Sequence, residues 1–133
     1  LGLAEAVRAE CERFSRQQEI AVELALNGIP DSLSRDASLC LFRVTQEALR
    51  NVARHARAGA VELSLQAKDG GLELEVRDDG QGFDSEVPPA SPALGLCGMR
   101  ERVRHLGGRF EVRSSPGEGT SVLTRLPLAR RSQ

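Results

Sequence analysis

Two segments of strict hydrophobic alternation constrain the fold of this chain more than any other feature. Residues 60–67, AVELSLQA, and residues 72–78, LELEVRD, place apolar side chains at every second position, and the turn residues KDGG join them. A period of two is typical of strands that bury one face, and a short glycine-containing connection pairs such strands as an antiparallel hairpin. The sequence therefore predicts a sheet with one face in the core and one in solvent.

The rest of the chain supplies further strands and the helices that cover such a sheet. Helical periodicity predicts three helices, over residues 3–17, about 35–57 and 99–106. Ser34 is a candidate N-cap for the second, and Gly107 with Gly108 ends the third. Alternation predicts three more strands, over residues 19–26, 109–115 and 120–128. We expect one α+β domain over residues 1–133, a two-layer sandwich whose mixed, mostly antiparallel sheet is covered by helices on one face.

Composition excludes several classes of function. The net charge is −1, so no overall field attracts nucleic acid or an anionic membrane, and no apolar run is long enough to span a bilayer. Cys11, Cys40 and Cys97 have no CxxC spacing. This indicates neither a disulfide framework nor a zinc site, and it favours a reducing, cytoplasmic setting.

The helix predicted over residues 35–57 carries a polar seam. At about 100° per residue, its apolar face consists of Leu41, Val44, Ala48, Val52 and Ala56. Glu47, Asn51 and His55 follow the border of that face at four-residue spacing. One interpretation is the solvated shoulder of an amphipathic helix. The other is the lining of a nucleotide pocket.

In the second interpretation the seam residues have distinct roles. Asn51 offers a neutral oxygen to a magnesium ion that keeps most of its waters and binds through phosphates. Glu47 would accept a proton or orient a metal-bound water. Arg54 and His55, one turn later, offer donors to phosphate oxygens.

Three glycine turns favour the pocket. VRDDGQGF ends a strand with Asp78 and then brings Gly80 and Gly82, whose spacing lets a backbone approach a flat ligand. GLCGMRERV places Gly95 and Gly98 directly before a helix, where free N–H groups and the helix dipole bind phosphate. GEGT, residues 117–120, begins the last strand. An ordinary turn would explain any one of them, but their joint appearance after the polar seam favours a nucleotide site, and no P-loop or Rossmann motif is present.

With these motifs the chain resembles the catalytic and ATP-binding domain of bacterial sensor histidine kinases, in the superfamily that includes gyrase, heat-shock chaperones and MutL. QEALRNVARHA resembles the N-box, and DDGQG, GLCGM and GEGT resemble the G1, G2 and G3 boxes. QEALxNxxRHA together with GLxGMRERVxxLGG is similar to the subgroup that partners response regulators with helix-turn-helix output domains. The resemblance covers nearly the whole chain and implies a Bergerat-type ATP-binding fold.

The resemblance also implies roles for individual residues. Asn51 would coordinate Mg²⁺, Asp78 would bind the adenine amine, and Thr120 would support the water network beside it. Glu47 is the candidate catalytic residue, as a base or as support for the metal. The other residues expected to contact ATP are Arg54, His55, Gly80, Gly82, Gly95, Leu96, Gly98, Met99 and Gly119. A flexible ATP lid would cover about residues 83–97, and residues 129–133 would form a basic tail.

The expected activity is transfer of the γ-phosphate of Mg-ATP to a histidine on a separate dimerisation domain, for relay to the receiver domain of a response regulator. Because neither His55 nor His105 suits the acceptor role, the chain is expected to be an excised catalytic portion. The full-length protein would be a homodimer with its kinase portion in the cytoplasm, whether or not the sensor has a membrane anchor.

Three alternatives remain open at this point. An anti-sigma-factor-type serine kinase and a non-catalytic adenine-nucleotide sensor share the fold. A DNA-binding module has as its only support the arginines of one helix, Arg43, Arg50, Arg54 and Arg57, which acidic residues elsewhere balance. We therefore expect no nucleic-acid partner.

Overall fold

A computed structural model describes residues 2–31, 33–82 and 96–128, without the side chains of residues 55, 56, 96 and 97. Its elements, in chain order, are α1 (Leu3–Gln18), β1 (Ala21–Asn27), α2 (Arg35–Asn51), the π-helical turn η1 (Val52–Ala56), β2 (Ala60–Lys68), β3 (Gly71–Asp78), α3 (Leu96–His105), β4 (Arg109–Ser114) and β5 (Thr120–Pro127). None of the described helices is long and apolar enough to cross a membrane.

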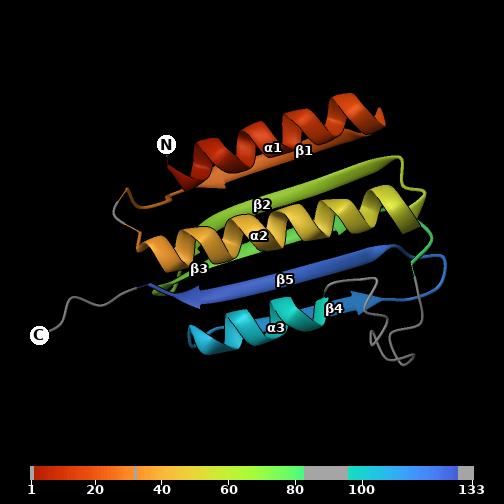
Figure 1. Ribbon diagram of the computed structural model, residues 1–133. Coiled ribbons are helices and arrows are strands. Elements are labelled where there is room, and N and C mark those ends of the chain that lie inside the picture. The colour runs from red at the N-terminus through yellow and green to blue at the C-terminus, as the bar shows by residue number, and fades with distance from the viewer. Residues whose placement is uncertain (1, 32, 83–95, 129–133) are drawn as a thin grey trace, which may run out of the picture.

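The strands form one five-stranded sheet in the order β1-β2-β3-β5-β4. The predicted hairpin is present, since β2 pairs antiparallel with β3, and β5 pairs antiparallel with both β3 and β4. Only β1 runs parallel to its neighbour β2, with Ala21 opposite Ala60. All three α-helices cover the same face of this sheet (Figure 1). The predicted α+β sandwich with a mixed, mostly antiparallel sheet is therefore confirmed.

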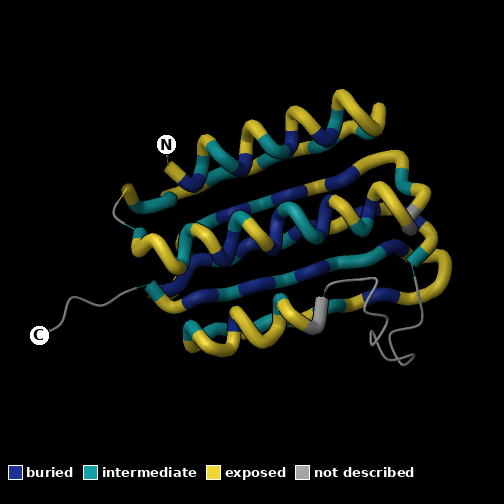
Figure 2. Tube along the Cα trace, in the orientation of Figure 1, coloured by how far each residue is buried: buried dark blue, intermediate teal, exposed yellow. Residues whose placement is uncertain are grey.

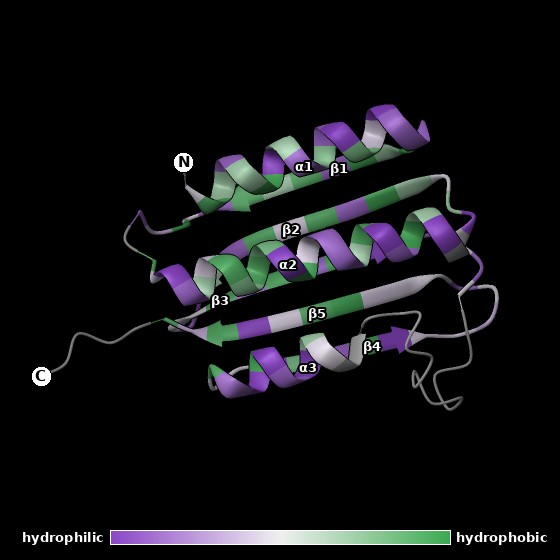
Figure 3. Ribbon diagram, in the orientation of Figure 1, coloured by the Kyte–Doolittle hydropathy of each residue, from purple (hydrophilic) through white to green (hydrophobic). Residues whose placement is uncertain are grey.

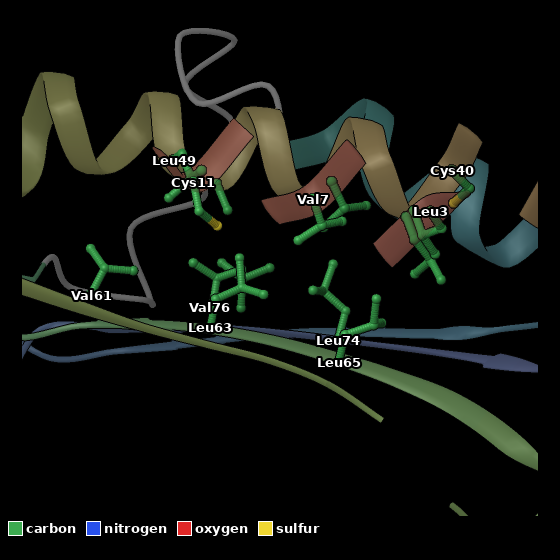
Figure 4. Close-up of a cluster of buried hydrophobic side chains, with 14 of the residues drawn as sticks. Leu3, Val7, Cys11, Cys40, Leu49, Val61, Leu63, Leu65, Leu74 and Val76 are labelled. Carbon is green, nitrogen blue, oxygen red and sulfur yellow. The ribbon is translucent and has the colours of Figure 1, made fainter. Parts of the chain in front are cut away.

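The core lies between the sheet and the helices. Along β2 and β3 the alternate residues are buried, as the period of two predicts, and Figure 2 shows the same alternation along the strands. Figure 4 shows Leu63 and Leu65 of β2 and Leu74 and Val76 of β3 pointing toward the helices, where Val7 of α1 and Leu49 of α2 point toward the sheet. Each fully buried Leu or Val of this kind contributes about 1.5–3 kcal/mol. Cys11 also packs here, and burial raises the pKa of its thiol to about 11.

The opposite face of the sheet is polar, so strand residues alternate between hydrophobic and hydrophilic along their length (Figure 3). Its ion pairs join neighbouring strands: Arg125 contacts Glu73 at 2.9 Å, and Arg77 contacts Glu62 at 3.5 Å. The Arg77–Glu62 pair is exposed and adds little stability, while the Arg125–Glu73 pair is partly buried.

The long helix departs from its prediction at one end. Ser34 caps it as expected, because Ser34 Oγ accepts a hydrogen bond from the Ala37 N–H at 3.1 Å. The α-helical part ends at Asn51, however, and the last predicted turn is the π-helical η1. The Val52 N–H donates to both the Ala48 and Leu49 carbonyls at this transition. Periodicity counts apolar spacing and does not distinguish a π-turn from an α-turn.

The predicted tail and nearly all of the predicted lid are not tested by the structure. Residues 83–95 and 129–133 lie outside the described residues. Helix α3 begins at Leu96, earlier than the predicted start at Met99, so the last two residues assigned to the lid belong to a helix. At its other end Gly107, with φ +79°, terminates the helix as predicted.

Candidate functional site

Asp78 occupies the end of β3 on the covered face of the sheet. It lies opposite Val61 of β2 and Thr120 of β5, and only 7% of its surface is exposed. The Gly80 N–H donates to Asp78 Oδ1 at 2.8 Å. Burial raises the pKa of this carboxyl, while hydrogen bonds from the Gly80 and Thr120 backbones partly oppose the rise. The result is a fixed, nearly enclosed acceptor, which suits a donor on a bound ligand.

Thr120 is held beside this carboxyl by a residue that the sequence did not reveal. Ser114, at the end of β4, pairs with Thr120, and the two hydroxyl oxygens lie 2.8 Å apart. Ser114 Oγ also donates to the Gly119 carbonyl at 3.0 Å. The signal for this role in the sequence was weak. The inward positions of β4 are Phe110, Val112 and Ser114, and Ser114 is the polar one.

The G1 and G3 boxes are joined backbone to backbone. The Gly117 N–H donates to the Gln81 carbonyl at 2.6 Å. Gly82 (φ +66°) and Gly119 (φ +79°) adopt left-handed conformations, and a Cβ on either would overlap a carbonyl oxygen, of Ser115 for Gly82 and of Asp78 for Gly119. These glycines are thus required by contact between two loops. Their predicted contact with a purine remains a prediction.

The polar seam lies along the border of α2, as predicted. Glu47 and Asn51 are half-buried, Arg54 is exposed, and the apolar face formed by Leu41, Val44, Ala48 and Val52 is buried. The side chain of His55 lies outside the described part of the chain. An amide and a carboxylate held at the edge of the core are partly shielded from water, which strengthens their interactions with charged ligands.

Glu47 opens onto a hollow of about 490 Å³ between the three helices. Arg50 lines it from α2, and Met99 and Arg102 line it from α3. Glu47 of the N-box and Met99 of the G2 box thus line the same hollow. Gly98 is exposed, and no described atom outside its own helix lies within 4 Å of a Cβ built on it. Gly95 and the side chain of Leu96 fall outside the description.

The boxes meet at one end of the molecule. In Figure 1 the last turns of α2, the start of β5 and the connection between β4 and β5 all lie at the same end. Nearby, Asp79 joins the end of β3 to the start of β2, because its carboxylate accepts hydrogen bonds from the Gly59 and Ala60 N–H groups. The end of α2, the start of β5 and the connection between β4 and β5 therefore lie at one end of the described structure.

The residues present fit a magnesium ion bound with phosphate. Among the described residues no group of three or more His, Cys, Asp or Glu is placed to hold a metal ion. Mg²⁺ commonly binds through one or two protein oxygens together with waters and substrate phosphates. The amide oxygen of Asn51 at the end of α2 is a donor of that kind.

Comparison with known proteins agrees with this arrangement. Residues 36–130 match the family described as histidine kinase-, DNA gyrase B- and HSP90-like ATPases. The chain is 36% identical over 129 residues to the sensor histidine kinase MctS of Rhizobium johnstonii, covering 96% of this chain and 28% of MctS. It is 36% identical over 127 residues to the sensor histidine kinase LiaS of Bacillus subtilis, covering 96% of this chain and 34% of LiaS. The chain thus spans about a third of these relatives.

Solved structures share the fold. The histidine kinase domain of the blue-light activated kinase EL346 from Erythrobacter litoralis gives a TM-score of 0.79 at 22% identity, covering 96% of this chain and 62% of that one. Full-length ShkA in complex with AMPPNP gives 0.79 at 20% identity, covering 100% of this chain and 31% of that one. The chain therefore belongs to the family of histidine kinase-, DNA gyrase B- and HSP90-like ATPases, as a domain of the sensor histidine kinase type.

Proposed function

We propose that this domain binds Mg-ATP and donates its γ-phosphate to a histidine on a separate dimerisation domain, for relay to an aspartate on the receiver domain of a response regulator. The observation that carries the proposal is the Asp78 carboxyl, buried at the end of β3 and fixed by the Gly80 N–H at 2.8 Å. The Gly80 N–H occupies one acceptor site of this carboxylate, an ionised carboxylate has about four such sites, and the exocyclic amine of adenine is a donor for another.

The same carboxylate accounts for selectivity between purines. Guanine presents a carbonyl oxygen where adenine presents its amine, so a second acceptor would face the Asp78 carboxylate. Leaving two acceptors opposed in a buried site costs more than losing one neutral contact. Thr120, fixed by Ser114 at 2.8 Å, would supply a hydroxyl beside the base. The pocket is therefore expected to prefer ATP over GTP.

The seam of α2 would serve the phosphate end. Asn51 would hold Mg²⁺, which neutralises charge on the phosphate oxygens during transfer. Arg54 is exposed in this region and offers guanidinium donors to phosphate. Glu47 lines the same hollow as Met99, and it would orient the incoming acceptor or take up its proton. Phosphoryl transfer depends mainly on such positioning and charge neutralisation.

The test of transfer uses γ-labelled ATP and a separately prepared dimerisation domain of a sensor histidine kinase. The expected product is labelled dimerisation domain whose phosphate is lost in acid and kept in base, as phosphohistidine behaves. An acid-stable phosphate would instead support the serine kinase. Absence of transfer from a domain that binds ATP would support the non-catalytic sensor.

A further inference from the structure

Asp79 connects the G1 box to the segment that follows the N-box helix. Asp79 Oδ1 accepts hydrogen bonds from the Gly59 N–H at 2.8 Å and from the Ala60 N–H at 3.1 Å. The Asp79 N–H donates in return to the Ala60 carbonyl at 3.3 Å. Three hydrogen bonds thus converge between one residue of G1 and two residues about twenty positions earlier in the chain.

The chemistry of this contact suits a carboxylate. Two backbone N–H groups point at one oxygen, and an ionised carboxylate is an acceptor-only group that forms stronger hydrogen bonds than a neutral one. The Ala60 and Gly59 amides lower the pKa of the Asp79 carboxyl, although the side chain is exposed. Asp79 is therefore ionised at neutral pH. Its exposed side chain is held in position by the two backbone hydrogen bonds.

The segment that Asp79 holds leads directly from Asn51. From Asn51 the chain passes through η1, a π-helical turn, and then Arg57 in a left-handed conformation at φ 53° before it reaches Gly59. π-helical turns are rare, and they occur frequently at functional sites. The chain after Asn51 is thus irregular in conformation. Its hydrogen bonds to the G1 box come from the Gly59 and Ala60 N–H groups, which the Asp79 carboxylate accepts.

On the other side, Asp79 directly follows Asp78, whose carboxyl is fixed by the Gly80 N–H at 2.8 Å. One short connection therefore joins the residue expected at the adenine to the segment expected at the phosphates. We propose that Asp79 is a positioning residue that sets the spacing between the adenine end of the site, at Asp78, and the phosphate end, at Asn51 and Arg54. The proposal rests on the proposed function, because it assigns those two ends to one nucleotide.

The test separates the two ends by using two ligands, Mg-ATP and adenosine, in equilibrium titrations of the whole chain. Adenosine has no phosphates, so it reports the adenine end alone. Asp79→Ala should weaken Mg-ATP binding on the order of tenfold, the size of a typical coupling between two sites. Adenosine affinity should change by less than about twofold. The Asp78 carboxyl is held by the hydrogen bond from the Gly80 N–H, which does not involve the Asp79 side chain.

Two further variants complete the experiment. Asp79→Asn keeps an acceptor oxygen without the charge and should recover part of the lost Mg-ATP affinity. Glu62→Ala removes another exposed carboxylate, from the polar face of β2, and should leave both affinities unchanged. Thermal unfolding is measured for each variant to show that the domain remains folded.

The outcomes distinguish the proposal from a structural role. Equal loss of ATP and adenosine binding in Asp79→Ala, or no loss of either, would overturn the positioning role. If Asp79→Ala does not fold, Asp79→Asn decides: weaker Mg-ATP binding with unchanged adenosine binding supports the proposal, and parallel changes overturn it. Failure of the wild-type chain to bind either ligand would count against the proposed function itself.

Discussion

The Asp78 carboxyl is poised between two opposing effects. Burial favours its neutral form and raises its pKa above the usual value of 3.8, while the amides of Gly80 and Thr120 favour the anion. The ionised carboxylate is the stronger acceptor for the adenine amine, so ATP binding should favour release of any proton that the carboxyl carries. ATP affinity should therefore fall as the pH drops through this raised pKa, by at most about tenfold for each pH unit.

Equilibrium titrations of ATP across the acid range, with circular dichroism to confirm folding, measure this effect. Asp78→Asn supplies the control, since it cannot ionise, and any protonation of ATP itself changes both proteins alike. The variant should bind ATP at least about tenfold more weakly at neutral pH. The ratio of the two affinities should shrink as the pH falls. A ratio that stays constant with pH would show that Asp78 does not titrate with binding.

Two glycines of the G3 box provide a matched pair. Gly119 and Gly117 both have positive φ, at +79° and +81°, but only at Gly119 would a Cβ meet backbone, the Asp78 carbonyl. Gly117→Ala should thus lower the free energy of unfolding by about 1 kcal/mol, which is the cost of holding alanine in the left-handed conformation. Gly119→Ala should lower the free energy of unfolding by about 1–3 kcal/mol more than Gly117→Ala, because the new Cβ would push the start of β5 away from the end of β3. Urea unfolding of both variants measures the difference, and equal losses would show that the contact between the boxes adds no stability.

The helix α2 carries the magnesium end of the proposed site. Asn51→Asp replaces a neutral oxygen donor by a charged one at nearly the same shape, so the fold should persist within about 1 kcal/mol. A fixed carboxylate changes the charge that the ion and the phosphates must balance, and transfer of the γ-phosphate should be lost. The measurement is autophosphorylation of the full-length kinase with unfolding of the isolated domain as control. Retained autophosphorylation would contradict the assigned role of Asn51.

Local chemistry made most individual elements predictable. The KDGG turn predicted the hairpin of β2 and β3. Ser34 predicted the start of α2, and Gly107 predicted the end of α3. The π-helical turn after Asn51 was not predictable, because the buried positions Ala48 and Val52 keep a four-residue spacing whichever hydrogen-bond pattern follows them. Asp79 was missed for a related reason: beside Asp78 it looked like one half of a turn, and its partners are about twenty residues away.

The assembled domain depends on contacts that no local pattern contains. The parallel pairing of β1 with β2 and the bond from Gly117 to Gln81 join distant segments, and only folding brings their partners together. The order of the boxes along the chain still indicated one site, and the structure brings Asp78, Thr120, Gly82 and Gly119 into direct contact or strand pairing. The sequence did not predict the hydrogen bonds by which Asp79 of the G1 box holds Gly59 and Ala60, which follow the N-box helix.

The central claim is that one adenine nucleotide extends from Asp78 to a magnesium ion on Asn51. Isothermal titration of the folded chain with ATP and with GTP, each with and without Mg²⁺, tests both ends together. We predict saturable binding of ATP that Mg²⁺ strengthens, and GTP binding weaker by at least about tenfold. A folded sample with no affinity for ATP in either condition, or with equal affinity for ATP and GTP, would contradict the account.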